Sequence, residues 1–303
     1  MSYKAEISRK HPSAFVFLID QSRSMGSPWG STDKNGDSSL IKAQAVADVV
    51  NSFLDELINR CQKEGGTNDY FDIALLGYGK KGGEAYFAWE PPLQDKDWCP
   101  VSELKTNFAD TIEEQVEVII RGKKITEKQI RKIWIKPVAS GTTPMKAALS
   151  QTKELLEDWI KEHSESFPPI VINITDAAAT DISDRQELID VANEIKSLKT
   201  TDGNVIIFNC HISSSKSTPT ILPATADELS DNDENAHMLF AMSSELPPKY
   251  NNLIIEVFDK DPISFTSARG MAYNIRDING LTKLLDIGTR VAVNSTSNIQ
   301  HKQ

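Results

Sequence analysis

Long apolar runs alternate along this chain of 303 residues with segments whose apolar positions repeat at helical spacing. Short continuous apolar runs are typical of strands buried on both faces, and the i, i+3, i+4 repeat is typical of helices that bury one side. Strands are therefore expected at 14–19, 70–78, 85–89, 169–175, 204–212 and 270–275. Helices are expected at 39–61, 144–163, 183–198, 234–246, 248–258 and 278–287.

This alternation of strands and helices predicts an α/β fold. We expect a Rossmann-like, doubly wound and mainly parallel central sheet with one antiparallel edge strand, at 85–89, and helices on both faces. Residues 12–290 are expected to form a single domain, between an N-terminal tail at 1–11 and a polar tail at 291–303. Residues 91–136 are interpreted as an insertion, for which the pattern leaves a hairpin and a short helix open.

Two helix starts carry local signals. Thr143 is expected to cap a helix whose first residue is Pro144, because proline suits the first helical position. Ser183 and Gln186 have the spacing of a capping box, which predicts that the next helix opens there.

The net charge and the cysteines indicate which class of partner and which cellular compartment suit this chain. Thirty-three basic and 43 acidic residues give a net charge of −10, which argues against nucleic acid as a partner. The apolar run at 14–19 is shorter than the core of a signal peptide, and no run is long enough to span a bilayer. Cys61, Cys99 and Cys210 are odd in number and widely spaced, so we expect free thiols, no membrane association and a cytoplasmic location.

Oxygen-bearing side chains stand at three of the predicted element boundaries. Asp20, Ser22 and Ser24 follow the first strand, Thr143 precedes a helix, and Asp176 follows the strand at 169–175. Ligand sites of parallel α/β sheets lie at the carboxyl ends of the strands, so these residues are expected to converge. Two carboxylates and three hydroxyls are hard ligands, which favour Mg²⁺, or Mn²⁺ or Ca²⁺, over Zn²⁺.

This set resembles the metal-ion-dependent adhesion site of the von Willebrand factor A (VWA) family. The family pattern is D-x-S-x-S, a distant threonine, and an aspartate that is often followed by glycine; here Ala177 stands in place of that glycine. By this resemblance the three hydroxyls coordinate the metal, and the two aspartates act directly or through water. Thr143 is preferred to Thr142 because Leu149 lies six positions after it, as in the family, although Thr142 stays open.

The resemblance also implies a function. The segments 168–176, 202–205 and 285–290 are similar to bacterial stand-alone VWA proteins that accompany kinases and phosphatases in stress and defence gene clusters. The resemblance implies that the chain is a protein-binding module rather than an enzyme. In this interpretation the metal captures an Asp or Glu of a partner protein, such as a kinase, a phosphatase or another gene-cluster neighbour. The residues beside the ligands, which we expect to contact that partner, are Met25, Thr142 and Ala177.

Two other functions stay open. The chain could be a scaffold that docks partners through the insertion at 91–136 while its metal site is structural. A metal-assisted phosphatase of the haloacid dehalogenase type would need a second carboxylate two residues after Asp20, and Ser22 stands there instead.

Four further motifs give weaker evidence for a functional site. Residues 33–37 begin like a calcium-binding loop but lack its glycine and glutamate. The segment 121–136 has seven basic residues and one acidic residue, and we favour a solvated face over a docking patch. The glycine-rich segment 77–83 is expected to be a turn and not a phosphate-binding loop, and His211 is expected to be structural.

Overall fold

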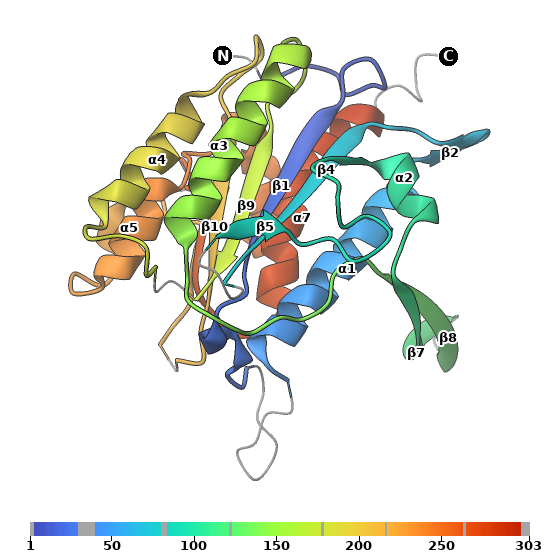
Figure 1. Ribbon diagram of the computed structural model, residues 1–303, viewed down its shortest axis with the longest axis horizontal. Helices are drawn as coiled ribbons and strands as arrows, with labels where there is room; N and C mark the ends of the chain where they lie inside the picture. Colours follow the sequence, from blue (N-terminus) through green and yellow to red (C-terminus); the bar gives the residue numbers. More distant parts are fainter. Residues whose placement is uncertain are drawn as a thin grey trace.

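The computed structural model describes residues 3–29, 40–79, 84–120, 123–176, 179–215, 217–262 and 265–297. One central sheet organises them, and helices cover both of its faces (Figure 1). Its strands run in the order β11-β12-β10-β9-β1-β4-β5, and β6 also pairs with β4. Their bounds are β1 Ser13–Asp20, β4 Phe71–Tyr78, β5 Ala85–Phe87, β6 Cys99–Pro100, β9 Ile170–Thr175, β10 Ile206–Ile212, β11 Thr220–Ile221 and β12 Met271–Ile275.

The five central strands β12, β10, β9, β1 and β4 are parallel, and the short strands β11, β5 and β6 pair antiparallel at the two edges. The predicted α/β class, with a mainly parallel sheet and an antiparallel edge, is confirmed. The chain adds β4 on one side of β1 and later places β9 on the other side. The direction of strand addition therefore reverses at β1, and such a reversal is where ligands bind in open α/β sheets.

Side-chain alternation along β1 divides the core between the two faces of the sheet. Phe15, Phe17 and Ile19 belong to one apolar cluster, while Val16 and Leu18 belong to the other, and all five are buried. Period-two alternation places neighbouring residues on opposite faces, and both faces here are covered. Because of this double burial, the strand is a continuous apolar run in the sequence.

The helices divide in the same way (Figure 1). Helices α1 (Lys42–Arg60), α6 (Asn251–Phe258) and α7 (Ile278–Ser297) pack with the first cluster. Helices α3 (Met145–Glu162), α4 (Gln186–Ser197) and α5 (Glu234–Met242) pack with the second. Short 3-10 helices are η1 (Arg23–Gly26), η2 (Ala226–Glu228) and η3 (Pro248–Tyr250).

The predicted insertion contains both of the elements that the sequence left open. Helix α2 (Val101–Thr106) is followed by a long hairpin of β7 (Asp110–Ile120) and β8 (Lys123–Ile133), which projects from the body (Figure 1). A second small hairpin, β2 (Gln62–Lys63) with β3 (Gly66–Thr67), was not expected.

Ion pairs along the projecting hairpin offset its basic residues. Arg131 lies 2.6 Å from Glu114 and 3.1 Å from Asp48, and Lys128 lies 3.1 Å from Glu113. Two of the basic residues in the segment 121–136 are therefore paired with acidic residues of β7 and α1. This arrangement favours the solvated face over the docking patch.

Both predicted helix-start signals are wrong in detail. Helix α3 begins at Met145, and its first turn is capped by the distant Asp181, whose Oδ2 accepts the Ala147 N–H at 2.9 Å. Helix α4 begins at Gln186, whose N–H donates to Asp184, while Glu187 accepts from Ser183. Carboxylates outcompete the hydroxyls because charged acceptors form the stronger cap.

Two segments that the sequence assigns to tails have tertiary contacts or regular secondary structure. Ile7 is fully buried, and Asp202 accepts hydrogen bonds from the backbone of Lys4 and Ala5. Helix α7 continues to Ser297, ten residues beyond its expected end at Ile287, which its apolar repeat did not reveal. The calcium-loop-like segment 33–37 lies outside the described residues, as do 80–83 of the glycine-rich segment.

Candidate metal centre

The loop that follows β1 is shaped by the carboxylate of Asp20. Asp20 is fully buried at the end of the strand, and its Oδ1 accepts the backbone N–H of Ser22 at 2.9 Å. The chain then enters the 3-10 helix η1, which places Ser22 at its start and Ser24 inside it. The hydroxyl oxygens of Ser22 and Ser24 therefore lie on the same side, 2.9 Å apart.

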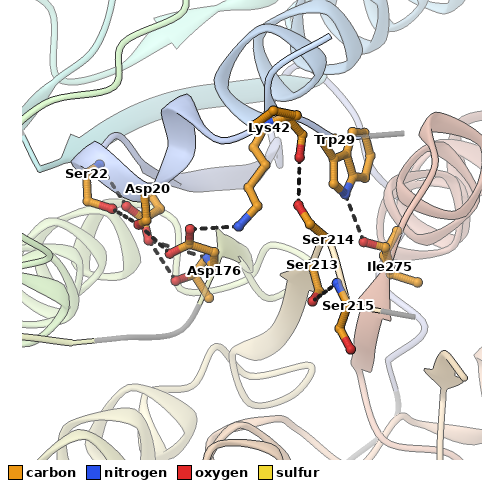
Figure 2. Close-up of polar contacts among 12 residues, drawn as sticks. Asp20, Ser22, Trp29, Lys42, Asp176, Ser213, Ser214, Ser215 and Ile275 are labelled. Atoms are coloured by element: carbon orange, nitrogen blue, oxygen red, sulfur yellow. Dashed lines mark hydrogen bonds and ion pairs between the residues drawn. The ribbon is translucent and has the colours of Figure 1, made fainter. Parts of the chain in front are cut away.

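The end of β9 brings the second aspartate to this loop. Oδ2 of Asp20 accepts the Thr175 hydroxyl at 2.9 Å and the backbone N–H of Asp176 at 3.4 Å. The Ser24 hydroxyl then donates to Oδ1 of Asp176 at 2.9 Å. Figure 2 shows Asp20, Ser22 and Asp176 gathered in this way. Four of the five predicted ligands, Asp20, Ser22, Ser24 and Asp176, are thus joined by hydrogen bonds.

The fifth, Thr143, reaches the same edge through its loop. The Ser140 N–H donates to the Gln21 carbonyl at 2.8 Å, and the Arg23 N–H donates to Gly141 at 3.3 Å. Thr143 itself is buried; its N–H donates to the Thr180 hydroxyl, and its carbonyl accepts the Thr180 N–H. Among the described residues its hydroxyl has no hydrogen bond, so this oxygen is not committed to a cap or a turn.

The three residues expected to meet a partner differ in their placement. Thr142 is exposed next to Thr143, whereas Met25 is fully buried in the apolar core. In this conformation the Met25 side chain is not available to a partner, because its place in η1 turns it inward. Ala177 lies outside the described residues.

Lys42 is a site residue that the sequence did not single out. Its ammonium lies 2.9 Å from Oδ2 of Asp176, and the two side chains are 10% and 5% exposed. Figure 2 shows the lysine extending from α1 toward the aspartate. The helix start predicted near residue 39 already placed this lysine in a first turn, where a positive charge is unfavourable.

His211, at the end of β10, borders the same site. Its ring stacks on Tyr273 with centroids 4.2 Å apart, accepts the Asn274 N–H, and lies within hydrogen-bond reach of the Asp176 backbone. Burial, together with the nearby charge of Lys42, lowers the pKa of His211 to about 4. A neutral, packed imidazole agrees with the structural role expected for it.

A chain of buried polar side chains leads from the site into the core. Tyr78 lies within hydrogen-bond reach of Thr175 and donates to Asn173 at 2.7 Å. Asn173 donates to Asn209, which donates to Ser243 at the end of α5. Because buried polar groups must be paired, this network fixes Thr175 and, through it, Oδ2 of Asp20.

Gly79 is a second residue whose role was missed. It has a φ of +131°, and a Cβ there would lie 2.3 Å from the backbone nitrogen of Ser22. The end of β4 thus presses against the loop after β1, and only glycine permits that approach. The glycine-rich segment gave the signal, but the sequence does not say which glycine touches which loop.

Burial dominates the electrostatics of Asp20. Burial and the charge of Asp176 raise the pKa of Asp20, hydrogen bonds from Ser22 and Thr175 oppose the rise, and the pKa moves from the ordinary 3.8 to about 6. A buried carboxylate next to another carboxylate calls for positive charge. The Lys42 ammonium supplies part of it, and a divalent cation would supply more.

The donor atoms fit such a cation. Among the described residues no cluster of three or more His, Cys, Asp or Glu side chains could hold a metal, so the hydroxyls are essential to any site here. Neighbouring ligand oxygens around octahedral Mg²⁺ lie about 2.9 Å apart, since metal–oxygen distances are about 2.0–2.1 Å. The pairs Ser22–Ser24 and Ser24–Asp176 have this spacing.

Cys61, Cys99 and Cys210 are buried and free, as predicted, so no thiol serves the site. Within the part of the chain that is described, no helix combines the length and the hydropathy needed to cross a membrane.

Known proteins give little information about the function of this chain. No family model matches this chain, and no curated protein matches it. It is similar to the solved structure of a conserved hypothetical protein, BatB, from Bacteroides thetaiotaomicron, with 11% identity, a TM-score of 0.41, and coverage of 95% of this chain and 98% of that one. An aerotolerance-related membrane protein from Bacteroides fragilis, with multiple mutations to serines, gives the same identity and TM-score, with coverage of 93% and 98%.

Proposed function

We propose that this chain is a VWA-type domain that binds a divalent cation, Mg²⁺ in the first place, and uses it to capture an acidic residue of a partner protein. The observation that carries this proposal is the hydrogen-bonded row of oxygens formed by Ser22, Ser24 and Asp176, with Asp20 behind it. These residues come from two strand ends at the point where strand addition reverses, and their oxygens have the spacing of metal ligands.

The residues of the site would have different roles in holding the metal. The hydroxyls of Ser22, Ser24 and Thr143 are neutral ligands, and Ser24 is exposed, which leaves the outer side of the site open. Both oxygens of Asp20 already accept bonds from protein donors, so Asp20 shapes the loop and meets the metal through water. A bound cation supplies positive charge that neutral hydroxyls do not cancel, and an incoming carboxylate would complete its shell.

Capture fits this site better than catalysis. Ser22 occupies the position where a phosphatase of the haloacid dehalogenase type needs a carboxylate, and its hydroxyl bonds to Ser24 instead of to a base. The neighbouring His211 is packed and neutral. We therefore propose a binding module in a bacterial signalling, stress or defence assembly of the cytoplasm, with a kinase, a phosphatase or another gene-cluster neighbour as partner.

A binding assay with gene-cluster neighbours tests this function. The wild-type chain should retain a partner in Mg²⁺ and release it in a chelator, and Asp20→Ala should not retain it in either condition. Circular dichroism checks that the variant is folded. Capture that persists unchanged without metal would contradict the mechanism.

A second candidate function is a scaffold that docks partners on the projecting hairpin, where two isoleucines are exposed. Ile112 and Ile130 are 43% and 61% exposed. They belong to adjacent rows of the ladder and so lie on opposite faces, which gives no continuous apolar patch. Asp110 and Ile133 are paired at its base, so a short turn can replace the hairpin. Loss of partner capture on that replacement, with Mg²⁺ binding intact, would favour the scaffold.

A further inference from the structure

Lys42 stands where helix stability does not explain a lysine. It is the first residue of α1, a position where the partial positive charge of the helix terminus opposes a cation. The first turn has no acidic residue, and Ile41 before it provides no side-chain cap. The location of this lysine must therefore be explained by what its side chain reaches.

The side chain reaches the candidate metal centre and is buried there. Its ammonium lies 2.9 Å from Oδ2 of Asp176, on the opposite carboxylate oxygen from the one that accepts Ser24 (Figure 2). Burying an ammonium is costly unless a carboxylate pairs with it. The pair is thus a built feature of the site and not a surface ion pair.

This contact changes the charge of the site. Asp20 and Asp176 together carry two negative charges when both are ionised, and the ammonium reduces the sum to one. A divalent cation that binds beside Ser24 meets a carboxylate whose other oxygen is already neutralised. The ammonium paired with that carboxylate would also repel the cation, which in a partly buried site is a large effect.

We propose that Lys42 is a built-in counter-cation of the metal centre: it neutralises Asp176 in the metal-free protein and opposes metal binding there. Metal affinity is then lower than the oxygen ligands alone would give. This inference rests on the proposed function, because it assumes that the metal binds at these oxygens.

Calorimetric titration of the purified chain with Mg²⁺ at pH 7.5 tests the proposal. Lys42→Met keeps the length of the side chain and removes its charge, and it should bind Mg²⁺ about tenfold or more tightly than the wild type. Lys42→Arg keeps the charge and should stay close to the wild type. Lys153→Gln is the matched control, because it breaks an ion pair of 2.8 Å with Glu194 outside the site. Unchanged or weaker binding by Lys42→Met would overturn the proposal.

A metal-free measurement separates this inference from the proposed function. A double-mutant cycle of Lys42→Met and Asp176→Asn, followed by urea unfolding in a chelator, should show that the two residues stabilise one another. Additive effects would overturn the role of Lys42 as counter-cation. If no variant binds Mg²⁺, the proposed function and the opposition to metal both fail. If the wild type binds Mg²⁺ and Lys42→Met binds it equally, only the present inference fails.

Discussion

The hydroxyl of Ser24 donates a 2.9 Å hydrogen bond to Oδ1 of Asp176, a residue 152 positions away in the sequence. The two meet because β1 and β9 are parallel neighbours and their carboxyl ends lie at the same edge of the sheet. No local pattern requires this contact, and it leaves two oxygens at the spacing that a shared cation needs.

Replacing Asp20 should separate stability from metal binding. Its folded-state pKa of about 6 lies above the ordinary 3.8, so the folded chain binds the extra proton, and this stabilisation is lost as the pH rises from about 4 to about 6. Between pH 4 and pH 7.5, metal-free Asp20→Asn should therefore gain stability relative to the wild type, by on the order of 1–3 kcal/mol, and it should no longer bind Mg²⁺. Urea unfolding at pH 4 and pH 7.5 checks this.

The sign of that difference is decisive. This relative gain should be absent at pH 4, where the carboxyl of the wild type is protonated as well. The hydrogen bonds that the amide cannot accept lower the stability of the variant equally at both pH values, so they do not affect the comparison. A difference in stability that stays the same at pH 4 and pH 7.5 would contradict the raised pKa of Asp20.

The two adjacent threonines can be told apart by their hydroxyls. Thr143→Val removes the buried hydroxyl with little change of shape, and Mg²⁺ should bind at least about tenfold more weakly because one ligand is lost. Thr142→Val removes the exposed hydroxyl and should leave the affinity unchanged. Calorimetry on both variants decides between them, and the reverse result would assign the ligand to Thr142.

Gly79 should prove necessary for the loop that holds Ser22. In Gly79→Ala the new Cβ would lie 2.3 Å from the Ser22 nitrogen, so the loop must move. We expect a loss of about 1–3 kcal/mol in the free energy of unfolding, together with the loss of Mg²⁺ binding. Gly65→Ala is the matched control: its φ is +102° but no atom lies within 4 Å of the new Cβ. If both variants bind Mg²⁺ normally, this contact does not position the site.

Thr175 should act on the metal through Asp20. Thr175→Val removes the hydroxyl that donates to Oδ2 of Asp20 and should weaken Mg²⁺ binding about 10- to 100-fold, as is usual for groups that orient ligands. Thr152→Val provides the control, since its buried hydroxyl donates to the Ala148 carbonyl within α3. An equal effect of both substitutions on affinity would indicate a general loss of packing.

The sequence was informative where local pattern and tertiary structure agree. The apolar runs that end in Asp20 and Asp176 predicted two buried strands, because double burial leaves no polar positions within them. The helix starts were mispredicted because other residues than the expected ones cap them: the distant Asp181 caps α3, and the local Asp184 accepts the first N–H of α4. The contacts of Lys42 and Gly79 could not be predicted from the sequence either, because each depends on which loop lies opposite that residue in the folded chain.

The central claim, that a cation is held by these oxygens, is tested most directly by crystals of the chain grown with Mn²⁺ and measured at the manganese absorption edge. The account predicts one anomalous peak per chain, within coordination distance of the hydroxyl oxygens of Ser22, Ser24 and Thr143 and bordered by Asp20 and Asp176. A peak elsewhere, or no peak in crystals whose solution contains millimolar Mn²⁺, would contradict it.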